Sequence, residues 1–260
     1  IKIAEDYENS ATMGPLIHNQ DEINRLKNDF NVGLYNNLSD VKDHDTVIIR
    51  THGIPKNDLK HLRTLNAKII NATCPFVTTP QQIVKKMSSE GYSILIFGDS
   101  DHPEVKGVQS YAENQDDVHI VLEPSDLQNI IFKNNKIATV AQTTKKKEKY
   151  LEIVNYLILK NKEVRVFNTI CDATFENQDA ARELSKEVDI MIVIGGKNSS
   201  NTKQLHSICL ENCPNSYLIE NETELENSWF LNKNLCGVTA GASTPDWIIQ
   251  QVVDKIESFN

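Results

Sequence analysis

The chain repeats itself at a spacing of about 97 residues, and this repeat restricts the fold more than any other feature of the sequence. Cys74 and Cys171 lie 97 positions apart, and each follows an apolar stretch and an Asn/Thr turn. Three later pairs of segments match in the same order: SILIFGD from Ser93 with IMIVIGG from Ile190, IVLEPSDLQN from Ile120 with YLIENETELEN from Tyr217, and ATVAQTTKK from Ala138 with GVTAGASTP from Gly237. Two copies of a four-strand module are therefore predicted.

The N-terminal stretch continues this order. TMGPLIHNQDEINRL (Thr12 to Leu26), VGLYNNLSDVKD (Val32 to Asp43) and VIIRTHGIPK (Val47 to Lys56) correspond to the second, third and fourth units of a module. Its first unit, which carries the cysteine, would come before residue 1. We therefore expect an N-terminally incomplete first module and a third equivalent cysteine about twenty residues upstream of Ile1.

Short β-branched runs alternate with small polar residues and helical periodicity throughout the chain, which is typical of an α/β protein with mostly parallel sheets. The repeat predicts three α/β modules, at residues 1–67, 68–163 and 164–260, the last with the C-terminal helix. Modules related by a pseudo-threefold axis, in a trefoil, would point the carboxyl ends of their strands at one central cavity. Ligands of parallel α/β sheets bind at these ends.

Composition excludes several classes of function. The 36 acidic and 27 basic residues give a net charge of −9, which argues against nucleic-acid binding. The basic run Lys145–Lys147 is interpreted as a solvated helix start. No apolar run is long enough for a membrane span, and five widely spaced cysteines without a secretory signal favour reduced thiols in a cytoplasm. Cys209, Cys213 and Cys236 lie outside the repeat register and are interpreted as structural.

Residues that follow the predicted strands would face the central cavity. They are His18, His52, Cys74, His102, Glu104, Gln142, Thr143, Thr144, Cys171, Ser199, Ser200, Asn201 and Ser243. Three symmetric cysteines suit a soft metal, and zinc, an iron–sulfur cluster and a catalytic thiol are all candidates. One cysteine per module, without a C-x-x-C pair, favours a cluster whose fourth corner is open to substrate.

The other cavity residues divide by chemistry. His18, His52, Ser199, Asn201 and Ser243 could donate to phosphate oxygens, in loops that open helices. In particular, the GGKNSSN segment (residues 195–201) is either a phosphate cradle or an ordinary helix cap. Burial in the cavity would raise the pKa of Glu104 and make it a general acid, and Thr143 could relay the proton.

The chain resembles the 4-hydroxy-3-methylbut-2-enyl diphosphate reductase family, which acts last in the non-mevalonate isoprenoid route. The motifs that carry the resemblance are GPLIHN, RTHGI, ATCPFVT, GDSDHPEVKGV, AQTT, NTICDAT, GGKNSSNTKQL and TAGASTPDW, in family order over nearly the whole chain. The resemblance implies a trefoil around a 4Fe–4S cluster with three cysteine ligands. Family members begin with a Gly-Phe-Cys loop, so we expect a chain that starts just after the first ligand.

The resemblance also implies residue roles. Cys74 and Cys171 would be cluster ligands, and Glu104, helped by Thr143, would supply protons. The residues expected to bind the diphosphate substrate are His18, His52, His102, Thr143, Ser199, Ser200, Asn201 and Ser243. Two electrons from a ferredoxin or flavodoxin would remove the substrate hydroxyl as water, through an allyl intermediate, to give isopentenyl or dimethylallyl diphosphate.

Two other classes of function remain open at this point. A cluster-free, non-catalytic diphosphate-binding paralogue would bind ligand without colour or redox activity. A Cys/His hydrolase would use Cys74 or Cys171 as a nucleophile beside a base, and iodoacetamide would inactivate it without metal. The symmetry of the two cysteines argues against the hydrolase.

Overall fold

The computed structural model describes residues 10–17 and 19–259. The chain divides into two compact units, which are described separately. The larger comprises Ile1–Leu16 and Lys27–Cys171, and the smaller comprises Ile17–Leu26 and Asp172–Asn260. Helix α2 (Gln20–Phe30) therefore begins in the smaller unit and ends in the larger.

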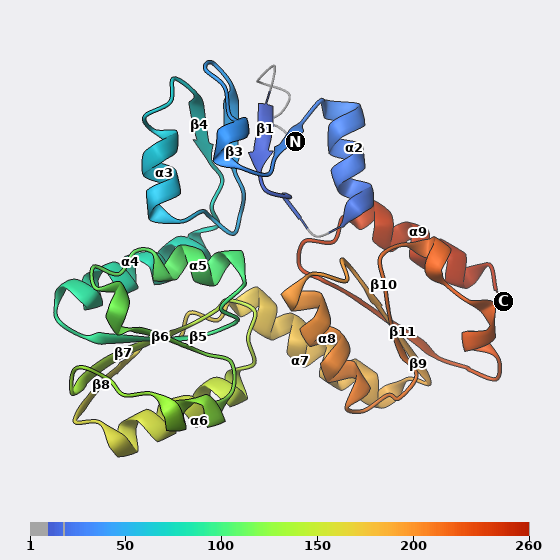
Figure 1. The fold of residues 1–260 in the computed structure, drawn as a ribbon. Coiled ribbons are helices and arrows are strands. Elements are labelled where there is room, and N and C mark those ends of the chain that lie inside the picture. Colours follow the sequence, from blue (N-terminus) through green and yellow to red (C-terminus); the bar gives the residue numbers. More distant parts are fainter. Residues whose placement is uncertain (1–9, 18, 260) are drawn as a thin grey trace. The chain divides into compact units, whose positions relative to one another are not determined.

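The larger unit contains two parallel sheets, of which the first has the strand order β2-β1-β3-β4 (Figure 1). Its elements are β1 (Ser10–Met13), β2 (Gly33–Tyr35), the 3-10 helix η1 (Leu38–Asp40), β3 (Thr46–Ile49), α3 (Lys56–Leu62) and β4 (Lys68–Asn71). Because the chain crosses from one side of β1 to the other between β2 and β3, the carboxyl ends of these strands form a switch point, where α/β sheets bind ligands.

The second sheet has the equivalent order β6-β5-β7-β8, and its pairings are also parallel. Its elements are α4 (Pro75–Ser89), β5 (Ser93–Phe97), α5 (Pro103–Gln109), η2 (Gln115–Asp117), β6 (Val118–Val121), η3 (Pro124–Asn129), β7 (Lys136–Ala141), α6 (Lys147–Lys160) and β8 (Glu163–Val166). Prolines at the first position of α4 and α5 suit the start of a helix, where the missing N–H is not needed.

Alternate residues of β5 face opposite sides of this sheet. Ile94 and Ile96 pack in the core under α4 and α5, whereas Leu95 and Phe97 pack in the core under α6. All four side chains are at most 1% exposed. Coverage on both faces explains why the strand is a continuous apolar run rather than an alternating one. Figure 1 shows α4 and α5 on one face and α6 on the other.

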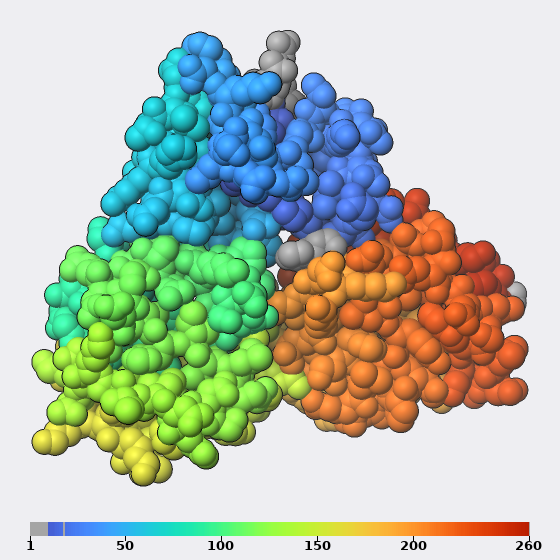
Figure 2. Space-filling model, in the orientation of Figure 1, coloured from blue at the N-terminus to red at the C-terminus, as the bar shows by residue number. Residues whose placement is uncertain are grey.

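Within the larger unit, the first sheet's α3 lies against α5 of the second sheet. The backbone N–H of Lys56, at the start of α3, donates to the Ser110 hydroxyl over 2.8 Å. Figure 2 shows the atoms of these segments, in cyan and green, in continuous contact. This contact brings the loop after β3 close to the loop that precedes α5.

The smaller unit contains one parallel sheet with the order β10-β9-β11. Its elements are α7 (Asp172–Glu187), β9 (Ile190–Ile194), α8 (Ser200–Leu210), β10 (Ser216–Ile219), η4 (Glu222–Glu224), η5 (Asn227–Phe230), β11 (Cys236–Ala240) and α9 (Asp246–Glu257). Ile192 packs on the α9 side, and Met191 and Val193 pack with Leu205 of α8 on the other side. The α/β class with parallel sheets is therefore confirmed.

The strands that lead to the two cysteines complete the preceding sheet, which the repeat did not predict. Strand β4 pairs with β3, and β8 pairs with β7. The expected module boundaries after residues 67 and 163 therefore fall before or within a strand that belongs to the previous sheet. The reason is that backbone pairing depends on neighbours in space, whereas a repeat shows only order along the chain.

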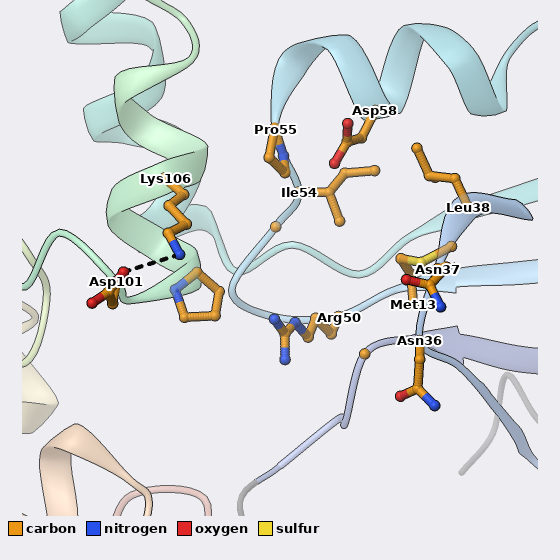
Figure 3. A pocket seen from close by; sticks show the side chains of 13 residues that line it. Met13, Asn36, Asn37, Leu38, Arg50, Ile54, Pro55, Asp58, Asp101 and Lys106 are labelled. Carbon is orange, nitrogen blue, oxygen red and sulfur yellow. Dashed lines mark ion pairs between the residues drawn. The ribbon is translucent and has the colours of Figure 1, made fainter.

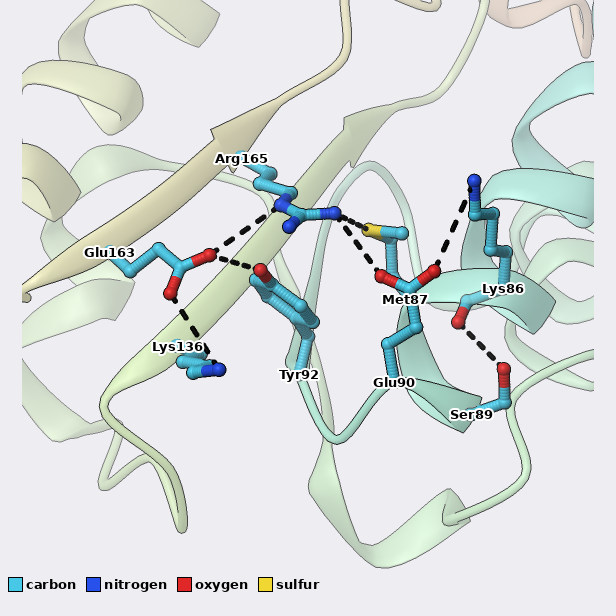
Figure 4. A network of polar contacts seen from close by, with 8 residues as sticks. All are labelled: Lys86, Met87, Ser89, Glu90, Tyr92, Lys136, Glu163 and Arg165. Carbon is cyan, nitrogen blue, oxygen red and sulfur yellow. Dashed lines mark hydrogen bonds and ion pairs between the residues drawn. The ribbon is translucent and has the colours of Figure 1, made fainter.

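A network of ion pairs closes the amino end of the second sheet (Figure 4). Arg165 of β8 contacts Glu163 over 3.5 Å and Glu90, which follows α4, over 3.2 Å. The Tyr92 hydroxyl also donates to Glu163. The ion-paired side chains are 39–45% exposed, and pairs that solvent reaches contribute little to stability. This end is opposite to the carboxyl ends that carry the candidate site.

No helix in the described part of the chain is long and apolar enough to cross a membrane.

Candidate active site

In each of the three sheets, one turn follows the strand that comes third along the chain (β3, β7 or β11). These three turns are equivalent, as the repeat predicts. In each turn, the backbone N–H of the fourth residue donates to the carbonyl of the first: Gly53 to Arg50 over 2.9 Å, Lys145 to Gln142 over 3.1 Å, and Thr244 to Gly241 over 2.8 Å. His52, Thr144 and Ser243 therefore occupy equivalent positions. The carboxyl end of each sheet thus presents the same backbone with different side chains.

The two predicted cluster cysteines are attached to the first two turns by equivalent hydrogen bonds. The Cys74 N–H donates to the Thr51 carbonyl, and the Cys171 N–H donates to the Thr143 carbonyl, both over 3.0 Å. Each cysteine directly precedes a helix, α4 or α7, and each is a half-buried free thiol. The symmetry predicted from the sequence is therefore present in the backbone around these thiols.

Glu104 lies in the first turn of α5 and is 1% exposed. Its two carboxyl oxygens accept separate hydrogen bonds from Thr143: the backbone N–H donates to Oε1 and the hydroxyl donates to Oε2, both over 2.7 Å. The Nδ1 atom of His102, which caps the helix, accepts the Glu104 N–H over 3.2 Å. The carboxyl group is therefore held in one orientation by the loop after β7.

Burial raises the pKa of Glu104, although the two hydrogen bonds from Thr143 and the charge of Lys145 act in the opposite direction. Removal from water disfavours the carboxylate, so the carboxylic acid is retained to higher pH and can donate a proton. The burial expected for Glu104 is therefore present, and its role as a general acid stays a prediction.

Lys145 is a residue of this site that sequence reasoning missed. It is half-buried, and burial lowers its pKa, while the charges of Asp99, Glu123 and Glu104 partly offset this effect. It was interpreted as part of a solvated basic run. Its position as the fourth residue of the turn, directly after two threonines, was the available signal.

His52 and His102 lie edge to face, with ring centroids 5.5 Å apart and ring planes at 75°. His52 belongs to the turn after β3 and His102 to the loop before α5, so the contact of the two sheets places them together. His102 contacts both His52 and Glu104, and Glu104 contacts Thr143. The larger unit thus brings together four predicted site residues.

The smaller unit contains the GGKNSSN segment between β9 and α8. Ser199 is the N-cap of α8, and its hydroxyl accepts the Thr202 N–H over 3.3 Å. Asn201 is 7% exposed, and its side-chain amide has no hydrogen-bond partner for either polar atom among the described residues. Buried amides in proteins are nearly always hydrogen-bonded. The segment is therefore a helix cap that also retains unused polar groups.

The remaining predicted residues are placed as follows. Ser200 is the first residue of α8 and is half-buried, and Ser243 is exposed in the turn after β11. His18 lies outside the described residues. Within the described ranges, no group of three His, Cys, Asp or Glu side chains is arranged to hold a metal ion.

The cysteines outside the repeat lie in apolar surroundings. Cys209 and Cys213 are buried in the core between α7, α8 and β9, and Cys236 is half-buried in β11. Burial raises the pKa of Cys209 and of Cys236 to about 11. Such thiols are not ionised near neutral pH, which agrees with a structural role.

Comparison with known proteins identifies the family of this chain. The model of the LytB protein family matches residues 1–257. The chain belongs to this family. It is 62% identical over 259 residues to 4-hydroxy-3-methylbut-2-enyl diphosphate reductase of Sulfurovum sp. (strain NBC37-1), a match that covers 100% of this chain and 93% of the relative. The identity to the reductase of Campylobacter concisus (strain 13826) is 61%, over 99% and 93% of the two chains.

Two solved structures of such reductases have the same fold. One, of the terminal enzyme of the non-mevalonate pathway, has a TM-score of 0.71 and 42% identity over 99% of this chain and 92% of that chain. The other, from Plasmodium falciparum, has a TM-score of 0.90 and 27% identity, over 97% and 80%. LytB proteins are iron–sulfur reductases, and the paired environments of Cys74 and Cys171 suit a thiolate-bound group of this kind.

Proposed function

We propose that this LytB protein removes the hydroxyl group of (E)-4-hydroxy-3-methylbut-2-enyl diphosphate reductively. The substrate takes up two electrons and two protons, its carbon–oxygen bond breaks, water leaves, and isopentenyl or dimethylallyl diphosphate forms. The observation that carries the proposal is the buried Glu104 carboxyl, held by two Thr143 donors beside His102. A reaction that consumes protons in a buried site needs such an acid.

We assign proton delivery to Glu104 and its orientation to Thr143. The acid must stay protonated near neutral pH, and burial of the carboxyl raises its pKa in that direction. The two hydrogen bonds from one residue prevent rotation of the carboxyl group, so that it presents a fixed geometry to the substrate.

Diphosphate binding belongs to the remaining polar residues in this proposal. Ser199 and Asn201, at the start of α8, offer hydrogen bonds close to the positive end of a helix. The unused amide of Asn201 gives the best support, because a phosphate oxygen would satisfy its N–H groups. The other members of the proposed set are His18, His52, His102, Thr143, Ser200 and Ser243.

Cys74 and Cys171 would be two of the three ligands of a 4Fe–4S cluster. When bound, such a cluster supplies single electrons and a Lewis-acidic position for the hydroxyl group. A ferredoxin or flavodoxin is the proposed electron donor, and the cytoplasm is the proposed location. The five free thiols are consistent with a reducing compartment.

The test uses the anaerobically reconstituted full-length protein, a one-electron dye as reductant, and mass-spectrometric detection of both products. Glu104→Gln is expected to lower turnover about 10²- to 10⁴-fold without weakening the binding of inorganic diphosphate. The matched control is Glu113→Gln, because Glu113 is exposed. Near-normal turnover of Glu104→Gln would exclude it from the proton path. Diphosphate binding without turnover in the wild-type protein would instead support the cluster-free paralogue.

A further inference from the structure

A cavity of about 370 Å³ lies at the carboxyl ends of the first sheet, entirely within the larger unit (Figure 3). The ends of β1, β2 and β3 contribute Met13, Asn36 and Arg50, and α5 contributes Pro103 and Lys106. This is the switch point of the sheet, where ligands of parallel α/β folds bind. Among the described residues that line it, none is assigned above to catalysis, diphosphate or cluster.

Arg50 places a positive charge in this cavity. Its Nη1 donates to the Pro15 carbonyl over 3.3 Å, and its buried Nε atom has no partner among the described residues. The guanidinium lies against Gly14, whose φ of +75° favours glycine, and a Cβ there would lie 2.9 Å from the guanidinium carbon. Arg50 makes no ion pair within the described ranges.

The fold does not require this charge. Arg50 is the first residue of its turn, and the equivalent residues in the other two sheets are Gln142 and Gly241. Gln142 joins two strand ends, since its Oε1 accepts the Asp99 N–H over 3.0 Å. Arg50 makes a similar connection to the loop after β1, but a neutral side chain would suffice for it. Burial also lowers the pKa of Arg50, which means that the charge is held against a desolvation cost.

The rest of the cavity determines which anion would fit. Met13 and Ile54 form an apolar wall. At the rim, Lys106 pairs with Asp101 over 3.4 Å, and Asp58 adds a negative charge (Figure 3). The lining is therefore neutral overall, with Arg50 and Lys106 against Asp101 and Asp58. A ligand with one negative charge placed at Arg50 is tolerated, whereas a multiply charged anion would be repelled by the rim carboxylates.

We propose that this cavity binds a small monocarboxylate, whose oxygens accept hydrogen bonds from the Arg50 guanidinium while its hydrocarbon part contacts Met13 and Ile54. The guanidinium fork matches the two oxygens of a carboxylate. Because none of the described lining residues belongs to the proposed diphosphate set, this carboxylate would be a second, non-substrate ligand of the chain.

The test is isothermal titration of the full-length protein with pentanoate, its neutral analogue pentanamide, and inorganic phosphate. Saturable one-site binding of pentanoate is expected, with much weaker binding of the other two. Arg50→Gln should weaken pentanoate binding about tenfold or more, because a charge-assisted hydrogen bond is lost. The control is Arg63→Gln, which removes the same charge from an exposed position and should leave affinity unchanged.

Several outcomes would overturn the proposal. Equal affinities for pentanamide and pentanoate would show that the cavity does not recognise the negative charge of the ligand. Tighter binding of inorganic phosphate than of pentanoate would exclude a monocarboxylate site. Competition by inorganic diphosphate would assign pentanoate to the diphosphate site. Because Arg50→Gln could fail to fold, Arg50→Lys provides a second variant that keeps the charge and loses the fork. Unchanged affinity in either folded variant would refute the role of the guanidinium.

Discussion

Replacing Thr143 by valine removes one of the two hydrogen bonds to the buried Glu104 carboxyl and nearly preserves side-chain volume. The lost bond is the 2.7 Å contact from the hydroxyl to Oε2, and the backbone N–H contact to Oε1 remains. A hydrogen bond to a charged group contributes about 1.5–3 kcal/mol, and the Glu104 carboxylate loses this stabilisation in Thr143→Val. The pKa of Glu104 should therefore rise further in this variant, because the ionised form loses a donor.

The assay is the pH dependence of kcat/KM in the reconstituted full-length protein. If Glu104 donates its proton, activity falls as pH rises through its pKa, so the alkaline limb should move upward in Thr143→Val. Thr144→Val is the matched control, because the Thr144 hydroxyl accepts from Gln142 and makes no bond to Glu104. A limb that stays in place, or one that moves equally in both variants, would refute the coupling of Thr143 to the acid.

Four further predictions concern stability and binding. Because burial raises the folded pKa of Glu104 above 4.5, the stability that this residue contributes is complete below pH 4.5 and is lost as pH rises through the folded pKa. Urea unfolding across this pH range should show that Glu104→Gln lacks this pH-dependent loss of stability. Parallel pH profiles of the variant and the wild type would contradict the prediction. Asn201→Leu should change the free energy of unfolding by no more than about 1 kcal/mol, since its amide has no hydrogen-bond partner among the described residues, yet weaken binding of inorganic diphosphate about tenfold. A strongly destabilised variant would contradict this expectation. Gly195→Ala places a Cβ 2.6 Å from a threonine hydroxyl at a φ of +150°. It should lower the free energy of unfolding by more than the roughly 1–2 kcal/mol expected for Gly91→Ala, where φ is +79° and no atom lies within 4 Å. Equal losses of stability in the two variants would argue against the clash. Arg165→Gln in the partly exposed network of Figure 4 should cost less than about 1 kcal/mol at low salt and nothing measurable at high salt. A large, salt-independent loss would mean that the ion pairs are effectively buried.

The repeat predicted more of this protein than any single motif. It located the strands around Cys74 and Cys171 and predicted that these cysteines are equivalent, and the paired hydrogen bonds to Thr51 and Thr143 agree. Such a prediction works because equivalent sequence around a parallel strand produces equivalent strand ends. The nomination of Glu104 as the acid also came from the sequence, because it lies two residues after His102 at the end of a predicted strand; its role stays a prediction.

The sequence could not predict which sheet each strand would join. Strands β4 and β8 contribute to the sheet before the helix that they introduce, and their short apolar runs are compatible with either neighbour. Lys145 was missed for a related reason, since a lysine run is normally solvated and only packing reveals that one member is half-buried near Glu104.

The sequence by itself determined the α/β class, the order of equivalent strands, the family, and the loops that hold polar residues. These follow from local periodicity and chain order, which every part of the sequence carries directly. Only the tertiary structure decided that Glu104 accepts two hydrogen bonds from Thr143, that no described residue pairs with the Asn201 amide, and that the Arg50 charge faces a cavity. Burial, pairing and desolvation depend on groups far apart in the chain, so they exist only once the sheets have packed.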